Sequence, residues 1–417
     1  GVTVGDVNGD GWLDMYISND FFERDYLYIN NRNGTFSEVL EQQMRSISGA
    51  SMGADMADIN NDGLPDIFVT EMLPEPEDRI KTKTTFENWD RYQYGVKNGY
   101  YHQFTRNMLQ LNNGDGTFSE IGRLAGVEAT DWSWGALMFD MDNDGRNDIF
   151  VANGIFQDLT DQDFLNFIAD DEMKRSFITE EGVDYKKLID VIHSEAIPNY
   201  AFHNQGGLDF TNKALEWGLA TPSFSNGSAY ADLDNDGDLD LVVNNVNMPV
   251  FIYRNETGHM HPENRYLRIV LQGEGKNTHA LGSRISILHR GQQWRLEQMP
   301  MRGFQSTVDH RPCFGLGPIP VVDIHLENEF VDFDRDRLIY HMLSTEGPRI
   351  ATGDVNGDGR MDFYIGGAKD QAGALFVQTA SGGFQRQPQA VFEEDKVSED
   401  TDALFFDADG DGDLDLY

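Results

Sequence analysis

The sequence predicts an all-β protein made of repeated blades, because one acidic loop, one apolar strand and one hairpin recur along its 417 residues. The loop reads Asp-x-(Asp/Asn)-x-Asp-Gly-x-x-Asp, and six copies occur. Each copy leads into a short segment of β-branched and aromatic residues, which is typical of a strand. Repeats of this size indicate stacked or radial units. The six copies begin at Asp6, Asp58, Asp140, Asp232, Asp354 and Asp407.

The spacing of the acidic residues predicts a cation site in every loop. A hard divalent cation takes several oxygens at about 2.3–2.6 Å, and alternate residues of a tight loop turn their side chains inward together. The seventh position varies freely, as expected where only its backbone carbonyl contacts the metal. An all-oxygen, acid-rich set favours Ca²⁺ over Mg²⁺ or Zn²⁺. We therefore expect up to six Ca²⁺ ions. Their ligands would be Asp6, Asn8, Asp10, Trp12, Asp14, Asp58, Asn60, Asp62, Leu64, Asp66, Asp140, Asp142, Asp144, Arg146, Asp148, Asp232, Asp234, Asp236, Asp238, Asp240, Asp354, Asn356, Asp358, Arg360, Asp362, Asp407, Asp409, Asp411, Asp413 and Asp415.

Two other interpretations of these loops explain less. An EF-hand requires a bidentate Glu at its twelfth position and flanking helices. Here the twelfth position is apolar and lies inside the predicted strand. Metal-free turns rich in Asp, Asn and Gly do not explain the Asp at the ninth position, beyond the turn. The twelfth residues of the first five loops are Ile17, Val69, Val151, Val243 and Ile365.

A recurring hairpin determines the predicted architecture. Strands ending in an Asn-Gly type of turn begin at Tyr26, Met108 and Tyr200, with a weaker copy from Leu375. Together with the strands around each acidic loop, they give about four strands per unit, which is the size of one β-propeller blade.

These motifs resemble a known family. The unit of loop, strand and NNGDGTF hairpin resembles the FG-GAP or VCBS repeat of integrin-α-type β-propellers, which implies calcium loops between the blade strands. Residues 264–287 and 302–317 are similar to the ASPIC/UnbV domain. In that family the domain follows an FG-GAP propeller in bacterial surface proteins and in a secreted cartilage protein of animals. The stretch from Pro222 to Asn247 resembles large Bacteroidota VCBS proteins.

The resemblance implies a domain order. We expect propeller blades over residues 1–260, interrupted by insertions 71–107 and 155–198. An ASPIC/UnbV-like domain over 261–328, a linker over 329–348 and blades of a second propeller over 349–417 would follow. The Trp-Pro strand that usually closes the family domain is missing, so we expect a shortened end. Both ends of the sequence lie inside loop units, and we expect further blades beyond them.

The amino-acid composition limits the kinds of ligand that the protein can bind. The net charge of −39 disfavours nucleic acid and anionic lipid as ligands. Cys313 is the only cysteine, so no intrachain disulfide forms, and its apolar neighbours predict packing rather than a reactive thiol. The sequence contains no run of 18 apolar residues, so it predicts no transmembrane helix.

The two insertions differ in character. Residues 155–198 show helical spacing, with a predicted cap at Thr160 or Asp161 and a second helix after Asp184. Residues 71–107 hold aromatic and basic side chains in an otherwise acidic chain, which predicts a surface for a protein or glycan, with a plain structural lid as the alternative. The residues concerned are Trp89, Tyr92, Tyr94, Tyr100, Tyr101 and Phe104 with Arg79, Lys81, Lys83, Arg91, Lys97 and Arg106.

The sequence favours binding over catalysis. No HExxH, GxSxG or Walker motif occurs, and His259 and His261 form an isolated pair, either a metal site or a polar turn. We expect a calcium-binding, cell-surface or secreted scaffold for a protein or glycan. The Bacteroidota resemblance implies an outer-membrane lipoprotein, anchored outside this sequence, that assists an uptake or secretion complex. The alternative is part of an extracellular polysaccharide-processing enzyme.

Overall fold

The structure is a computed structural model that describes residues 1–20, 23–84, 88–170, 177–179, 182–183, 185–273, 275–289, 292–319, 323–326, 350–367, 370–380, 384–398, 400, 403–409 and 413–417. Most of the regular structure is β, which confirms the predicted class. The chain forms two compact units, one of residues 1–279 with 299–318, the other of 280–298 with 319–417. The predicted linker, the cap residue Asp184 and the ligand Asp411 lie outside the described residues. The domain boundaries expected from the sequence remain predictions.

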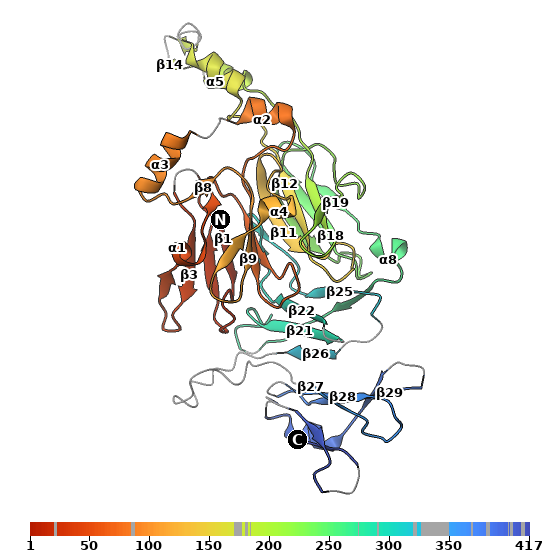
Figure 1. Cartoon of the computed structure of the whole chain (residues 1–417). Helices are drawn as coiled ribbons and strands as arrows, with labels where there is room; N and C mark the ends of the chain where they lie inside the picture. The colour runs from red at the N-terminus through yellow and green to blue at the C-terminus, as the bar shows by residue number, and fades with distance from the viewer. Residues whose placement is uncertain are drawn as a thin grey trace. The chain divides into compact units, whose positions relative to one another are not determined.

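The first unit contains four consecutive antiparallel sheets, coloured from red to green in Figure 1. In each sheet the strand before an acidic loop pairs with the strand after it, which pairs in turn with the first strand of the hairpin. These sheets are the predicted blades. Their strands are β1 (Val2–Gly5), β2 (Asp14–Ile17), β3 (Tyr26–Asn30) and β4 (Phe36–Glu38), then β6 (Ala54–Ala57), β7 (Asp66–Val69), β9 (Met108–Asn112) and β10 (Phe118–Glu120), then β11 (Ser133–Phe139), β12 (Asp148–Asn153), β15 (Tyr200–Asn204) and β16 (Phe210–Asn212), and finally β17 (Ser225–Ala231), β18 (Asp240–Asn245) and β19 (Phe251–Tyr253).

Shorter elements connect and extend these sheets, and two helices confirm the helical insertion. Asp161 accepts a hydrogen bond from the Phe164 N–H at 2.8 Å and so caps the first helix of that insertion. Among the described residues no helix has the length and hydropathy needed to cross a bilayer. These elements are α1 (Leu40–Gln43), β5 (Ile47–Ser48), α2 (Glu77–Lys83), α3 (Trp89–Lys97), β8 (Gln103–Phe104), α4 (Gly122–Ala125), α5 (Gln162–Ala169), β13 (Ile178–Thr179), β14 (Gly182–Val183), α7 (Tyr185–Asp190), α8 (Thr257–Met260), β20 (Arg265–Arg268), β23 (Met301–Arg302), β24 (Ser306–Thr307) and β25 (Cys313–Gly317).

Neighbouring sheets of the first unit pack face to face through apolar side chains. Successive residues of a strand point to opposite faces, so Ile67 packs toward the first sheet while Phe68 packs toward the third. Likewise Ile149 faces the second sheet and Phe150 the fourth. In the second and third sheets both faces of the strand that follows the acidic loop are covered, so this strand is fully buried and holds the loop at its end.

One asparagine per sheet joins it to the loop of the sheet before. Asn112, Asn204 and Asn255, the interblade asparagines, lie at or just after the end of the third strand of the second, third and fourth sheets. Their side-chain amides donate to loop carbonyls of the preceding sheet, at 2.9, 2.9 and 2.7 Å. Each bond gives a hydrogen-bond partner to a loop carbonyl at the contact between two sheets. The acceptors are the second residues of the first three loops, Val7, Ile59 and Met141.

A hairpin from the region expected to form the ASPIC/UnbV-like domain packs instead against the first strands of several blades. Its Arg302 donates two bonds of 2.7 Å to the Asp55 carboxylate on β6. The same guanidinium reaches the carbonyls of Met56 and Met138 and the Tyr230 hydroxyl, at 3.1, 2.9 and 2.9 Å. One arginine therefore ties β6, β11 and β17 together. Although burial by itself lowers the pKa of Arg302, Asp55 and Tyr230 hold that pKa above its usual range.

The second unit repeats the blade plan. Its fifth acidic loop joins the first two strands of a four-stranded antiparallel sheet, and the sixth joins a pair of short strands. A separate three-stranded sheet has the order β22-β21-β26. The elements are β21 (Arg284–His289), β22 (Gln292–Glu297), β26 (Asp323–Leu326), β27 (Ile350–Gly353), β28 (Asp362–Ile365), β29 (Ala374–Gln378), β30 (Phe384–Gln387), α10 (Ala390–Asp395), β31 (Phe405–Phe406) and β32 (Asp415–Leu416).

Candidate metal centres

The first five acidic loops are folded by hydrogen bonds from their own backbone to their own side-chain oxygens. In the third loop the Asp144 N–H lies 3.2 Å from carboxylate oxygens of both Asp140 and Asp142, and the Gly145 N–H donates to Asp140 at 2.8 Å. The Arg146 N–H donates to Asp144 at 2.9 Å. The first, second and fifth loops repeat these bonds. The alternate acids are therefore gathered on the inner side of the turn, as the spacing predicted.

The fourth position of the loop has a backbone requirement that the sequence analysis missed. It adopts a left-handed conformation, with φ between 57° and 74° in the five loops where it is described. Glycine enters this region freely, and asparagine does so more readily than other residues with a Cβ. The signal was present in the sequence, because the position is only ever Gly or Asn. The five residues are Gly9, Asn61, Asn143, Asn235 and Gly357.

The ninth position fastens the loop to its own sheet. In the third loop one Asp148 oxygen accepts from the Met141 N–H at 3.0 Å, and the other accepts from the Asn204 N–H at 2.8 Å. The same two bonds occur in four other loops, which explains an Asp beyond the turn independently of any metal. These ninth residues are Asp14, Asp66, Asp240 and Asp362.

Carboxylates converge in three of the loops. In each, three oxygens from different residues lie within 4.8 Å of one another, which fits the oxygen-rich set that a hard divalent cation takes. The carbonyl ligands predicted at the seventh position remain predictions. The three groups are Asp140, Asp142 and Asp148; Asp232, Asp234 and Asp236; and Asp407, Asp409 and Asp415.

The buried loops hold negative charge that lacks compensation. Burial raises the pKa of Asp58 to about 6 and that of Asp66 to about 8, and neighbouring loop carboxylates add to both shifts. Burial, with the charge of Asp142, raises the pKa of Asp140 and of Asp148 well above the usual range. A bound cation would stabilise the ionised carboxylates and remove this cost.

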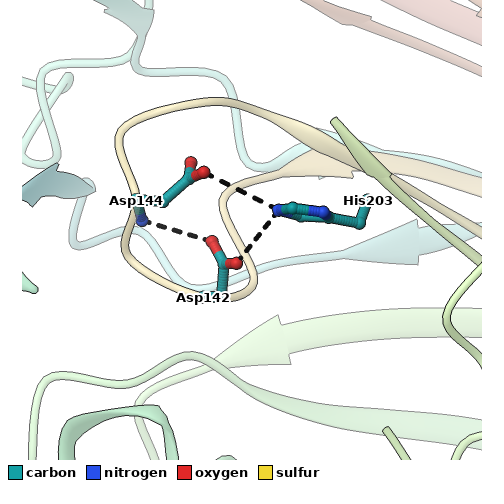
Figure 2. Close-up of side chains that lie close together, drawn as sticks. All are labelled: Asp142, Asp144 and His203. Atoms are coloured by element: carbon teal, nitrogen blue, oxygen red, sulfur yellow. Dashed lines mark hydrogen bonds and ion pairs between the residues drawn. The ribbon is translucent and has the colours of Figure 1, made fainter. Parts of the chain in front are cut away.

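A histidine that the sequence analysis missed lies against the third loop. Figure 2 shows His203 pointing toward Asp142 and Asp144, with its Nε2 at 3.2 and 3.7 Å from one oxygen of each. The ring packs edge-on against Trp217, with centroids 5.6 Å apart. His203 immediately precedes an interblade asparagine. Only an alignment of equivalent strand positions between the sheets would have identified His203 from the sequence.

Arginines surround the fourth loop instead. Arg268 forms an ion pair with Asp232, the first residue of that loop. Arg254 places its Nε 2.9 Å from Asp234 and an Nη 3.6 Å from Asp236. The fourth loop therefore carries cationic side chains at the carboxylates that were predicted to hold a metal.

The remaining candidates show no special chemistry. The isolated histidines of the sequence, His259 and His261, are exposed and lie 3.8 and 3.5 Å from Glu256 and Glu263, which fits a polar turn. Burial, together with nearby loop carboxylates, raises the pKa of Cys313 to about 12, so its thiol is not activated.

Sheets of three or four strands, each with a carboxylate-lined loop between its first two strands, define a β-repeat protein of the propeller type. The FG-GAP-like repeat family matches residues 6–69, 99–151 and 354–417, and the ASPIC and UnbV family matches residues 273–325. The chain therefore contains FG-GAP-like repeats and a segment that matches the ASPIC and UnbV family, as the sequence motifs indicated.

Individual relatives are distant. Cartilage acidic protein 1 of Mus musculus is 22% identical over 289 residues, which cover 62% of this chain and 42% of that protein. An Agrocybe aegerita lectin, described as recognising non-reducing terminal N-acetylglucosamine, gives a TM-score of 0.28 at 15% identity, covering 92% of this chain and 78% of its own. The exotype rhamnogalacturonan lyase YesX gives a TM-score of 0.21 at 13% identity, and the match covers 88% of this chain and 52% of the lyase. TM-scores this low carry no argument about fold or function.

Proposed function

We propose that this chain is a calcium-stabilised binding scaffold that works outside the cell or at its surface and catalyses no reaction. The observation that carries the proposal is the convergence of loop carboxylates at the ends of buried blade strands. FG-GAP repeats often bind calcium, which supports the choice of metal. The acids at the first, third, fifth and ninth positions would hold the ion, and the ion would neutralise their mutual repulsion.

Contacts between loops would carry the effect of one ion to the next blade. Asn61 of the second loop donates to the Gly145 carbonyl of the third loop at 2.9 Å. Asn143 of the third loop donates to Asp238 of the fourth at 2.8 Å. Because these bonds join residues that flank the carboxylates, ordering one loop favours the ordered form of its neighbour.

The surface proposed to bind a partner is smaller than the sequence predicted. Arg79 bonds Glu195 at 2.6 Å and also pairs with Asp131, while Lys83 is buried against Asp158 at 3.2 Å. These cations join insertion 71–107 to neighbouring segments and are not available to a ligand. That part of the prediction is wrong, because long basic side chains in an acidic protein find internal partners.

Helix α3 keeps its side chains available. Trp89 and Tyr94 are 69% and 68% exposed, and the neighbouring Arg91 and Lys97 are exposed as well. Aromatic residues and arginine are the types that dominate binding hot spots. We propose that this α3 surface, formed by these four residues, contacts a protein or a glycan.

The proposed location follows the family. FG-GAP repeat proteins are typically extracellular or surface-exposed. A lipoprotein of the outer membrane that assists an uptake or secretion complex is the finer form of the proposal.

A glycan array in millimolar Ca²⁺ tests the binding role. We expect the double variant Trp89→Ala, Tyr94→Ala to lose the binding of the wild-type chain while its melting temperature stays the same. The matched control is Leu124→Ala, Leu215→Ala, which removes apolar side chains that are 80% and 86% exposed. Binding unchanged in the α3 variant would remove this surface from the proposal. Turnover of a bound polysaccharide would replace the scaffold with the enzyme alternative.

A further inference from the structure

The third loop offers a ligand chemistry beyond oxygen. His203 Nε2 and single oxygens of Asp142 and Asp144 lie within 4.8 Å of one another (Figure 2). The two acids occupy the third and fifth loop positions, and the histidine comes from β15 of the same sheet. Imidazole suits divalent transition metals, whereas calcium prefers oxygen ligands throughout.

The ring nitrogen is placed like a ligand rather than like a hydrogen-bonding group. Nε2 is shielded from solvent and has no hydrogen bond, and its neighbours are the Asp142 and Asp144 oxygens at 3.2 and 3.7 Å, which form ion pairs with it only when the ring is protonated. Buried polar atoms nearly always have a partner, so an atom without one calls for a physical reason. Edge-on packing against Trp217 holds the ring, and the bond between Asn204 N–H and Asp148 holds its strand. Apart from a movement of the Arg146 side chain, which binds Asp144, little rearrangement would be needed to bring the three atoms around one ion.

Strand register shows that this position faces the loop acids in other sheets too. Phe202 pairs with Ile149 as Gln110 pairs with Ile67 and Tyr253 with Leu241. The next residues along, His203, Leu111 and Arg254, are therefore equivalent. Leucine cannot bind a metal, and Arg254 is a fixed cation beside the third and fifth acids of its loop. Of these three equivalent residues, only the histidine can donate a lone pair.

We propose that the third loop binds a divalent transition-metal ion of the Mn²⁺ to Zn²⁺ series, with His203 Nε2, Asp142 and Asp144 among its ligands. The inference rests on the proposed metal binding by the loops and specifies which ion one of them takes. Arg146 has to yield, because its guanidinium donates to Asp144 and, at 2.9 Å, to the Asn204 carbonyl. Its side chain is 40% exposed and can swing into solvent.

Co²⁺ and Zn²⁺ are the probes. The full chain is stripped with EDTA, returned to millimolar Ca²⁺ and titrated with Co²⁺ by visible absorption and with Zn²⁺ by calorimetry. We expect one tight equivalent in the wild type and an affinity weaker by about tenfold or more in His203→Leu. The control His310→Leu removes a different histidine, one whose ring contacts His279 at 4.5 Å, and should bind like the wild type. Equal binding by His203→Leu and wild type would overturn the inference.

If His203→Leu folds poorly, a second variant that should gain a Co²⁺ site tests the inference. Leu111→His places an imidazole at the equivalent position beside Asn60 and Asp62 of the second loop, and a second Co²⁺ equivalent is expected. Zn²⁺ should also shift the Nε2 NMR resonance of His203 in the wild type. No shift would mean that His203 is only a cationic partner of the two acids. Calcium-dependent melting, recorded on the same samples, tests the proposed function separately. Intact calcium stabilisation without Co²⁺ binding would contradict this inference alone.

Discussion

The third and fourth acidic loops have the same register and contact each other, yet their charges are compensated differently. The third loop buries Asp140 and Asp148, whose pKa values burial raises well above the usual range. The fourth loop has one more acid, Asp238, but Arg268 and Arg254 pair with its carboxylates. We therefore expect that the number of acids alone does not rank the sites by affinity. What matters is which cation, an ion or a side chain, neutralises them.

The fifth loop extends the contrast. There Asp354 is only partly buried, and backbone N–H groups, Gly359 first among them, lower its pKa. The same nine-residue pattern thus raises the pKa of its first acid in the buried third loop and lowers it in the more open fifth loop. The proposed metal ions would therefore contribute most to folding where the loops are buried, because each buried carboxylate must be either protonated or paired.

Removing metal should have the largest effect. EDTA is expected to lower the melting temperature strongly, since a site filled at roughly 100 times its Kd contributes about 2.7 kcal/mol. Hydrogen exchange resolves the loops, and the third loop should lose protection before the fourth, whose arginines remain in place. Equal melting curves with EDTA and with Ca²⁺ would contradict calcium stabilisation. Equal loss of protection in both loops would contradict the expected difference in their dependence on metal.

The ion pair between Arg302 and Asp55 involves no metal, so its contribution to stability can be compared with the loss caused by metal removal. Arg302→Ala leaves the Asp55 carboxylate buried without its partner, and such a loss typically costs about 3–5 kcal/mol. Urea unfolding in Ca²⁺ measures it through the midpoint of the first unit. The paired variant Asp55→Leu, Arg302→Met removes both charges and should recover much of the stability. A single variant as stable as the wild type would show that the hairpin does not hold the blades.

The blades were predictable from sequence, whereas the contacts between them were not. Loop and hairpin motifs are local, so spacing and composition were enough to place β1 to β3 or β27 to β29 around their acids. Arg302 and Asp55 are 247 residues apart, and Asn204 bonds a carbonyl 145 residues earlier. Such pairs depend on how complete blades pack, which no local pattern encodes. His203 is hidden for the same reason, since its strand position meets the loop only after the sheet has formed.

The pH dependence of stability should separate loop acids from other buried acids. Burial raises the pKa of Asp25 to about 6, although Tyr16, Asn19 and Ser51 donate hydrogen bonds to it. A carboxyl group with a raised folded-state pKa stabilises most below its usual value of 3.8. That contribution, about 3 kcal/mol, is lost as pH rises through 6.

Asp25→Asn mimics the protonated group and should flatten the decline in stability between pH 4 and pH 7. The measurement is urea unfolding in saturating Ca²⁺, which keeps the loop acids ionised and paired. Asp209→Asn, a change at an exposed carboxylate, serves as the control and should follow the wild-type curve. If the free energy of unfolding of Asp25→Asn declines with pH as steeply as that of the wild type, the whole pH dependence comes from the loop acids.

The smallest expected effect tests the role of the arginines directly. The sequence predicts tighter calcium binding by loops with Asp at the third position, namely Asp142, Asp234 and Asp409, than by those with Asn, namely Asn8, Asn60 and Asn356. In the fourth loop Arg254 opposes that ranking, because it already pairs with Asp234. Arg254→Ala should raise the calcium affinity of this loop by roughly two- to fivefold, a modest change because the pair is solvent-exposed and screened by salt.

Calcium titration monitored by hydrogen exchange at residues 232–240 measures this affinity. Arg32→Ala is the matched control, since Arg32 pairs with Asp10 of the first loop at 3.0 Å and should affect that loop alone. The gain in Arg254→Ala should also shrink as salt is added, because screening already weakens the ion pair in the wild type. If the fourth loop binds calcium equally with and without Arg254, side-chain cations do not set its affinity, and the number of acids regains its value as a predictor.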